Sequence, residues 1–222
     1  MQSRILLSDF LIITNLTFRC FYLYCLKNQK MKMVVEIWSD VVCPFCYIGK
    51  RKLEKALAMF EHKNDIELVW RSYQLHPDVE TQLDKTIYDY LAERNGITVE
   101  QIKEQYGFIN DMAAEVGLKY QLDTAILVNT RNAHRLIQIA KKEGKDSYAE
   151  ELLFKAYFTE NKNIDDKSIL ENIAISLGIK KEEFNAQLLS KEIDTEIDND
   201  IYQSKQIGVR GVPFFLMNNE VS

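Results

Sequence analysis

The sequence predicts an α/β fold in which a β-α-β unit and a later strand are separated by a long helical insertion. Three observations support this fold. Two short apolar runs, 33–38 and 66–73, flank a stretch with helical periodicity. Residues 84–205 are almost entirely helical in pattern, and a third apolar run follows a glycine-punctuated turn at 208–213. A chain of 222 residues with 46% hydrophobic content is long enough for one domain with such an insertion.

Each element of the β-α-β unit has its own signature. Residues 33–38 form a bulky, β-branched run that ends in the polar pair Ser39-Asp40, as expected of a buried strand that leads into a loop. From 47 to 62, apolar residues recur on one helical stripe while charged residues occupy the other face. Residues 66–73 complete the unit, and its short connections require a parallel strand pair with a right-handed crossover.

The insertion is predicted to contain several helices with recognisable ends. Thr98 and Gln101 fit a capping box. The predicted helices are 85–94, 99–116, 130–142, 147–159, 167–177 and a long last stretch from 182. Glycines mark expected helix ends at Gly96, Gly117, Gly144 and Gly178. Aromatic residues at helical spacing are predicted to lie in the core: Tyr88, Tyr106, Phe154, Tyr157 and Phe158.

The third strand is predicted to begin directly after Pro213. Proline is tolerated at the first residue of a strand but not within one, so Pro213 is placed at the mouth of the apolar run Phe214–Met217. The preceding glycines, Gly208 and Gly211, are typical of a turn.

Charge and the N-terminal residues exclude some classes of partner and location. The net charge is −5 and basic residues are scattered among acidic ones, so nucleic acid is not an expected partner. Residues 1–30 have apolar runs interrupted by Asp9, Asn15 and Arg19 and give no clean secretory signal or membrane span. We therefore expect a disordered leader or non-native extension at 1–30, no membrane partner, and a cytoplasmic location.

Two of the four cysteines stand where redox chemistry is expected. Cys43 and Cys46 lie at the start of the helix that follows the first strand, whereas Cys20 and Cys25 lie in the N-terminal stretch. A thiol at a helix N-terminus faces unpaired N–H groups and the positive end of the helix dipole, which favour the thiolate. Cys46 lies about one turn further on and can resolve a mixed disulfide. Pro44 suits the first helical turn. Cys43 is therefore the expected attacking thiol.

A zinc site is the alternative interpretation of this cysteine pair. It requires two further ligands at suitable spacing. The histidines at 62, 76 and 134 are isolated in sequence, and Cys20 and Cys25 have no well-ordered segment to hold them. A C-x-x-C motif between a strand and a helix of a β-α-β unit favours redox chemistry, and no metal is predicted.

Three segments together resemble a known family. The active-site segment 36–49, EIWSDVVCPFCYIG, resembles that of DsbA-like thiol oxidoreductases of the FrnE type. Residues 129–136, NTRNAHRL, resemble a helix of that family's inserted domain, and 208–215, GVRGVPFF, resemble its cis-proline loop. The likeness runs from about residue 33 to the last residues.

The resemblance implies a thioredoxin fold interrupted by a helical domain. The thioredoxin-like domain would comprise 33–76 and 190–222, and the helical insertion 77–189. Pro213 would be cis and would face the dithiol, and Val212 would offer its backbone to an extended substrate. Pro44 and Phe45 would also contact substrate, with Tyr47 and Ile48 beside them.

A proton-transfer group beneath Cys46 is a further implication of the resemblance. Glu36 and Asp40 are the acidic candidates, although Glu36 lies seven residues before Cys43 and can equally reach solvent. His134 can belong to a ligand groove or can simply bond to a neighbouring loop.

Three functions remain open from the sequence. The first is thiol–disulfide exchange on proteins or small thiols without a bound cofactor. The second is a glutathione-dependent reaction, as in 2-hydroxychromene-2-carboxylate isomerases and kappa-class transferases, with glutathione as co-substrate. Those relatives usually carry serine in place of the attacking cysteine, so the two retained cysteines favour the first function. The third is an inactive, truncated product.

The third interpretation comes from the end of the sequence. Nine residues follow Pro213, which is too few for both the final antiparallel strand and the closing helix of a thioredoxin fold. Exposed apolar surface is then expected to reduce stability at about 25 cal/mol per Å².

Overall fold

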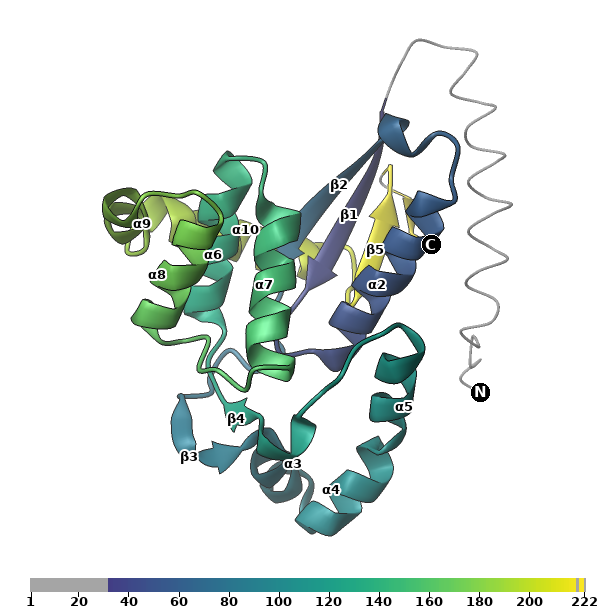
Figure 1. Ribbon diagram of the computed structural model, residues 1–222, viewed down its shortest axis with the longest axis vertical. Helices are drawn as coiled ribbons and strands as arrows, with labels where there is room; N and C mark the ends of the chain where they lie inside the picture. Colours follow the sequence, from purple (N-terminus) through teal and green to yellow (C-terminus); the bar gives the residue numbers. More distant parts are fainter. Residues whose placement is uncertain (1–31, 219, 222) are drawn as a thin grey trace.

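The structure of this chain, a computed structural model, describes residues 32–218 and 220–221 (Figure 1). The predictions for residues 1–30, Cys20 and Cys25 included, lie outside the described residues. One sheet has the strand order β2-β1-β5-β6. Its strands are β1 (Met33–Ser39), β2 (Ile66–Ser72), β5 (Phe214–Met217) and β6 (Glu220–Val221).

The predicted β-α-β unit is confirmed by the strand pairing. β1 runs parallel to β2 with Val35 opposite Leu68, and antiparallel to β5 with Ile37 opposite Phe215. Helix α2 (Pro44–Ala58) and the short 3₁₀ turn η1 (Lys63–Asp65) connect β1 to β2. β6 pairs antiparallel with β5, so the expectation of a sheet truncated directly after the third strand is wrong, and a short final antiparallel strand follows it.

Alternation along β1 assigns its side chains to two faces of the sheet. Val35 and Ile37 pack in an apolar cluster with Trp70 and with Leu53 of α2. Trp38 points to the other face, where its indole Nε1 donates a hydrogen bond of 2.9 Å to the backbone of α10. Helices α2 and α10 therefore cover opposite faces of the sheet (Figure 1).

The segment between β2 and β5 is mostly helical, as predicted. Its helices are α3 (Ile87–Asn95), α4 (Val99–Tyr106), α5 (Phe108–Glu115), α6 (Arg131–Lys142), α7 (Asp146–Phe158), α8 (Lys167–Ser176), α9 (Lys181–Gln187) and α10 (Lys191–Gln206), with a 3₁₀ turn η2 (Leu122–Thr124). In Figure 1, α3–α5 lie beyond the end of β1 and α6–α9 lie beside the sheet.

Three details of this segment differ from the sequence-based prediction. Residues assigned to helix and loop form a small antiparallel sheet of β3 (Gln82–Thr86) and β4 (Ile126–Leu127). The helix expected at 99–116 is divided at Gly107, and the long last helix is divided before Ser190. Ser190 accepts a hydrogen bond from the N–H of Glu192 and so caps a new helix start.

One apolar cluster joins the thioredoxin-like part to the insertion. It contains both active-site cysteines, the buried side chains of α2, and side chains from the insertion as far as α10. The predicted aromatic core residues Tyr88, Phe154, Tyr157 and Phe158 are buried in it, and Tyr106 packs against it. The dithiol helix and the insertion therefore share a core across the predicted domain boundary at residues 76 and 77, while the sheet has a separate apolar cluster of Val35, Ile37 and Trp70. In the part of the chain described here, no helix has the length and apolar character needed to cross a bilayer.

Candidate active site

Cys43 occupies the N-cap position of α2. Its backbone is extended, with φ −87° and ψ 112°, and Pro44 follows in the first helical turn. A tight turn brings it there, because the N–H of Cys43 donates to the carbonyl of Asp40 at 2.9 Å and the N–H of Cys46 donates to the carbonyl of Cys43 at 3.0 Å. The thiol therefore lies at the positive end of α2, where a thiolate is stabilised.

Cys46 is the more deeply placed thiol. Both cysteines are free and buried, with 4% of Cys43 and 1% of Cys46 exposed. Burial raises the pKa of the Cys46 thiol well above its usual value, and the neighbouring Cys43 raises it further. Cys46 is therefore a protonated thiol at neutral pH, which suits a resolving role better than an attacking one.

The loop before β5 faces the dithiol. The Val212–Pro213 peptide bond is cis, as the resemblance implies. The thiol of Cys43 donates a hydrogen bond of 3.4 Å to the carbonyl of Val212. Gly49 of α2 lies so close to the Pro213 ring that a Cβ there would stand 3.1 Å from its Cγ. The structure thus brings Cys43, Cys46, Val212 and Pro213 together.

The insertion supplies part of the surroundings of the dithiol. The hydroxyl of Tyr120 donates a hydrogen bond of 2.8 Å to the carbonyl of Pro44. Phe45 is half-buried and its ring lies 6.2 Å from that of Phe108 on α5, which is largely exposed. Tyr47, by contrast, is buried, and its ring stacks on Phe154 at 4.8 Å. The prediction that Tyr47 lies at the substrate surface is therefore wrong, because the helix turns this side chain into the core.

Ile48 is likewise buried in the shared core and is not a contact surface for substrate. Its position on the helical stripe of α2 that faces the core explains this burial.

The two acidic candidates for proton transfer have different surroundings. Glu36 alternates with Val35 and Ile37 and so points away from the face that α2 covers, where its carboxylate accepts a hydrogen bond of 2.8 Å from Arg71 Nε. The structure therefore places Glu36 on the sheet face opposite the dithiol helix. Asp40 is buried, and its carboxylate accepts a hydrogen bond of 2.7 Å from the N–H of Leu75.

His134 lies against the neighbouring loop, as one of its two predicted roles requires, but neither of its ring nitrogens makes a hydrogen bond within the described residues. Its Nε2 lies 3.4 Å from Oδ1 of Asp40, and both side chains are buried. The two approach without the alignment of a hydrogen bond. His134 thus packs against the loop that precedes the dithiol and lines no open groove.

Two buried residues near Cys46 were missed by the sequence analysis. Ser39 lies beside Cys46 and its side chain opposes the rise in the pKa of that thiol, while the Ser39 hydroxyl donates a hydrogen bond of 3.4 Å to Oε2 of Glu150 on α7. Burial raises the pKa of Glu150 to about 8, and the Asp40 charge raises it while Lys50 opposes the shift. The signal was available, because Glu150 falls on the same helical stripe as Leu153, an apolar core position.

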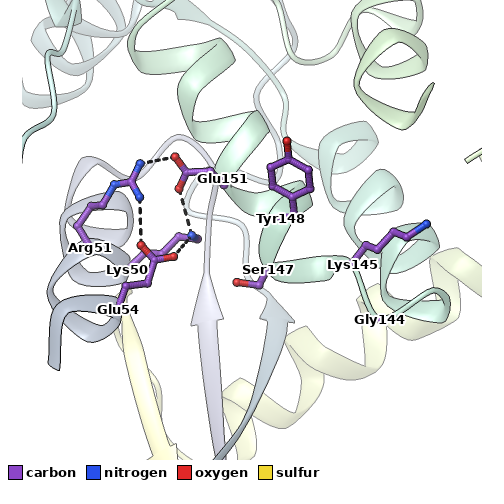
Figure 2. Close-up of a pocket in the computed structure, with 8 residues that line it drawn as sticks. All are labelled: Lys50, Arg51, Glu54, Gly144, Lys145, Ser147, Tyr148 and Glu151. Atoms are coloured by element: carbon purple, nitrogen blue, oxygen red, sulfur yellow. Dashed lines mark hydrogen bonds and ion pairs between the residues drawn. The ribbon is translucent and has the colours of Figure 1, made fainter. Parts of the chain in front are cut away.

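A polar cleft of about 400 Å³ opens between α2 and α7 (Figure 2). Glu151 accepts hydrogen bonds from Lys50 at 3.1 Å, from the Tyr47 hydroxyl at 2.7 Å, and from Arg51. Lys50 and Arg51 also pair with Glu54. These charges neutralise one another, so the cluster fastens the dithiol helix to α7.

The described residues contain no group of three or more His, Cys, Asp or Glu side chains arranged to hold a metal ion. The site contains one thiol at a helix N-terminus and a second, protonated thiol one turn away. The rings of Phe45 and Phe108 form an apolar surface beside them. This arrangement can form and resolve a mixed disulfide.

Comparisons with known proteins agree with this geometry. The model of the DSBA-like thioredoxin domain matches residues 34–222. A probable DsbA oxidoreductase from Streptomyces coelicolor has a similar structure, with a TM-score of 0.77 and 32% identity over 84% of this chain and 80% of that one. The uncharacterised protein YwbO of Bacillus subtilis is 26% identical over 196 residues, which is 86% of this chain and 90% of YwbO.

More distant structures share the fold alone. The cytosolic disulfide reductase DsbM from Pseudomonas aeruginosa, also solved with GSH, has a TM-score of 0.58 at 13% identity over 85% of this chain and 87% of DsbM. A 2-hydroxychromene-2-carboxylate isomerase has a TM-score of 0.61 at 16% identity over 85% of this chain and 87% of its own. The family match covers the whole sheet, the dithiol and the insertion. The chain belongs to the DSBA-like thioredoxin domain family of thiol–disulfide oxidoreductases.

Proposed function

We propose that this protein carries out thiol–disulfide exchange with Cys43 as the attacking thiol and Cys46 as the resolving thiol. The observation that carries the proposal is the different placement of the two sulfurs. Cys43 caps α2 and faces the Val212 carbonyl, while Cys46 is buried behind it with a raised pKa.

The exchange proceeds in two displacements. The Cys43 thiolate attacks a substrate disulfide, which forms a mixed disulfide and releases the first substrate sulfur as a thiolate. Cys46 then loses its proton and attacks the Cys43 sulfur, which releases the second substrate sulfur. The substrate disulfide gains two electrons and the enzyme dithiol loses two. In reverse, the same steps oxidise a substrate dithiol.

Substrate contacts are proposed for the residues that border Cys43. The Val212 and Pro213 backbone forms one side, and an extended substrate can add its main chain to this loop. Pro44 and Phe45 form the other side, and the Phe45 and Phe108 rings present an apolar surface beside the sulfur. We further propose a cytoplasmic location and glutathione as a small-thiol co-substrate, a choice supported by the cytosolic DsbM and its structure with GSH.

The proposal is tested with single cysteine variants. Insulin reduction and dithiol oxidation are measured for the wild type, Cys43→Ser and Cys46→Ser. Cys43→Ser is expected to lose both activities, because serine is a far weaker nucleophile than a thiolate. Cys46→Ser is expected to accumulate a mixed disulfide at Cys43, detected by mass spectrometry. Full activity in Cys43→Ser would contradict the proposal.

A further inference from the structure

We propose that Glu150 of α7, acting through the hydroxyl of Ser39, takes up the proton of Cys46 during resolution and returns it in the reverse reaction. This inference deepens the proposed function and rests on it.

The geometry places three buried groups side by side. Ser39, at the end of β1, lies beside Cys46 and favours its thiolate, and the Ser39 hydroxyl donates a hydrogen bond of 3.4 Å to Glu150 Oε2. All three side chains are essentially inaccessible, with 1% of Cys46, 0% of Ser39 and 1% of Glu150 exposed. Bulk water therefore cannot readily accept the Cys46 proton, and a protein group must do so.

Protons and charges balance when the three groups act as a proton relay. In resolution the Cys46 S–H proton moves to the Ser39 oxygen while the Ser39 hydroxyl proton moves to Glu150. The products are a Cys46 thiolate, a neutral Glu150 and a Ser39 hydroxyl that now points at the thiolate. When the Cys43–Cys46 disulfide is opened by a substrate thiolate, Cys46 leaves as a thiolate and the two protons move back.

The charges around Glu150 suit a group that changes protonation. Lys50 of α2 favours its ionised form, whereas Asp40 of the preceding loop and Asp146 of its own helix oppose it. Burial is the largest influence, and the resulting pKa of about 8 leaves both forms populated near neutral pH. A proton-transfer group works best in that range.

The other acidic groups fit the role less well. Glu36 projects from the opposite face of the sheet and is held by Arg71. The backbone of Asp40 lies near Cys46, but the Asp40 carboxylate accepts a hydrogen bond from the N–H of Leu75 and lies beside His134.

The test separates attack from resolution with the aromatic disulfide 5,5′-dithiobis(2-nitrobenzoate). The full chain carries Cys20→Ser and Cys25→Ser, so only the dithiol reacts. Stopped-flow absorbance then records one released thiolate when Cys43 attacks and a second when Cys46 resolves. Glu150→Gln is expected to leave the first phase unchanged and to slow the second about 100-fold at pH 7, the lower end of general acid–base effects.

The pH profile distinguishes proton transfer from a packing role. In the wild type the second-phase rate is expected to rise with pH and to level near pH 8, as Glu150 loses its proton. In Glu150→Gln that inflection disappears, and the rate keeps rising toward the higher pKa of Cys46. Ser39→Ala is expected to slow the same phase and provides a second test if Glu150→Gln does not fold.

Matched variants control for charge and packing. Glu160→Gln changes a carboxylate just beyond the same helix that pairs with Lys155 and Lys162, and is expected to keep the wild-type profile of the second phase. An unchanged second phase in Glu150→Gln, or loss of the inflection in Asp40→Asn but not in Glu150→Gln, would overturn the inference. Absence of the first phase in the unmutated dithiol would instead overturn the proposed function.

Discussion

At the scale of single residues, the buried carboxyl of Glu150 links stability to pH. Its pKa in the folded chain is about 8, against an ordinary value of 4.5. The folded state therefore prefers the protonated form. The contribution of Glu150 to stability is greatest at and below about pH 4.5 and declines as the pH rises to about 8, because the buried carboxyl must then either hold a charge or keep a proton that the unfolded chain releases.

Glu150→Gln should remove this pH dependence. The variant is expected to gain stability relative to the wild type as pH rises from 5 to 8, by a few kcal/mol in all, since each pKa unit corresponds to about 1.4 kcal/mol. Urea unfolding at several pH values measures the difference. A constant difference across that range would mean that Glu150 titrates normally in the folded chain.

Single functional residues could be predicted from the sequence where a short motif around the residue identifies its role. The dithiol and Pro213 carry their own motifs, so their positions could be read from short segments. Ser39 and Glu150 are 111 residues apart and meet only through tertiary packing. The role of Glu36 stayed open in the sequence, because a position seven residues before Cys43 does not show which face of the sheet its side chain occupies.

At the scale of elements, the contact between α2 and the Pro213 loop sets the position of Cys43 against its substrate surface. Gly49 permits the close approach, because any side chain there would meet the Pro213 ring. Glycine is needed at this position because a side chain would have no room, and not because of an unusual backbone conformation.

Gly49→Ala should therefore affect activity more than stability. Alanine favours the helix by about 1 kcal/mol, and overpacking opposes this by about 1–3 kcal/mol. The displaced loop is expected to slow the exchange reaction several-fold, measured with the insulin assay alongside a thermal melt. Gly211→Ala, whose Cβ would meet nothing within 4 Å, is the stability control. Wild-type exchange rates in Gly49→Ala would show that the loop can yield without consequence.

Element boundaries were predictable where periodicity or caps were strong. The three sheet strands and most insertion helices follow the expected ranges. The helix expected from 85 begins at Ile87 because Thr86 and Asp89 form a capping box. The β3–β4 pair was not predictable, because residues 82–86 are largely polar and β4 has only two residues.

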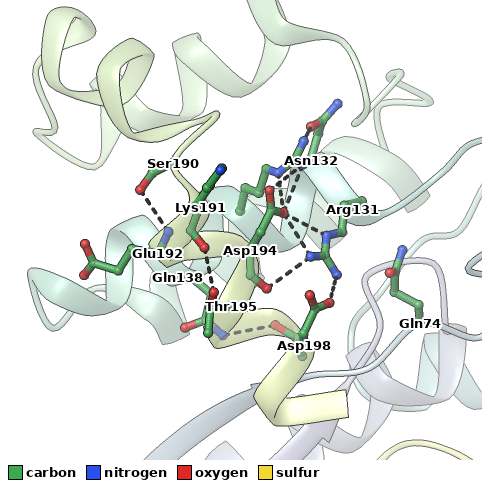
Figure 3. A network of polar contacts seen from close by, with 12 residues as sticks. Gln74, Arg131, Asn132, Gln138, Ser190, Lys191, Glu192, Asp194, Thr195 and Asp198 are labelled. Carbon is green, nitrogen blue, oxygen red and sulfur yellow. Dashed lines mark hydrogen bonds and ion pairs between the residues drawn. The ribbon is translucent and has the colours of Figure 1, made fainter. Parts of the chain in front are cut away.

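At the scale of the whole molecule, one buried carboxylate ties the sheet to two helices. Asp200 of α10 accepts hydrogen bonds from the Ser72 N–H at 2.9 Å, from Gln138 of α6 at 2.7 Å and from Arg71 at 3.0 Å. A second, more exposed network of Arg131 and acidic residues of α10 lies nearby (Figure 3).

Asp200→Ala should destabilise the whole chain. It leaves buried donors on the sheet and on α6 unpaired, which is expected to lower the free energy of unfolding by about 3 kcal/mol. Asp198→Ala, two residues away, breaks an exposed pair with Arg131 and should cost no more than about 1 kcal/mol. Urea unfolding compares the two. Equal losses would show that the buried network contributes little beyond a surface pair.

The domain organisation was predictable in part. Helical periodicity identified the insertion, but periodicity within a segment does not show which surfaces of two segments meet. The apolar cluster that includes Cys46 extends from α2 through the insertion, so the dithiol helix and the insertion share one core.

The positions of the tryptophans allow the unfolding of the sheet to be followed separately from that of the helices. Both tryptophans of the chain, Trp38 of β1 and Trp70 of β2, are buried. Their fluorescence therefore reports on the sheet, whereas far-ultraviolet circular dichroism reports mainly on the helices of the insertion. Because the buried Asp200 network joins the sheet to α6 and α10, the two signals should change together on heating. Any difference between the two melting temperatures measures how far the insertion can unfold while the sheet stays folded.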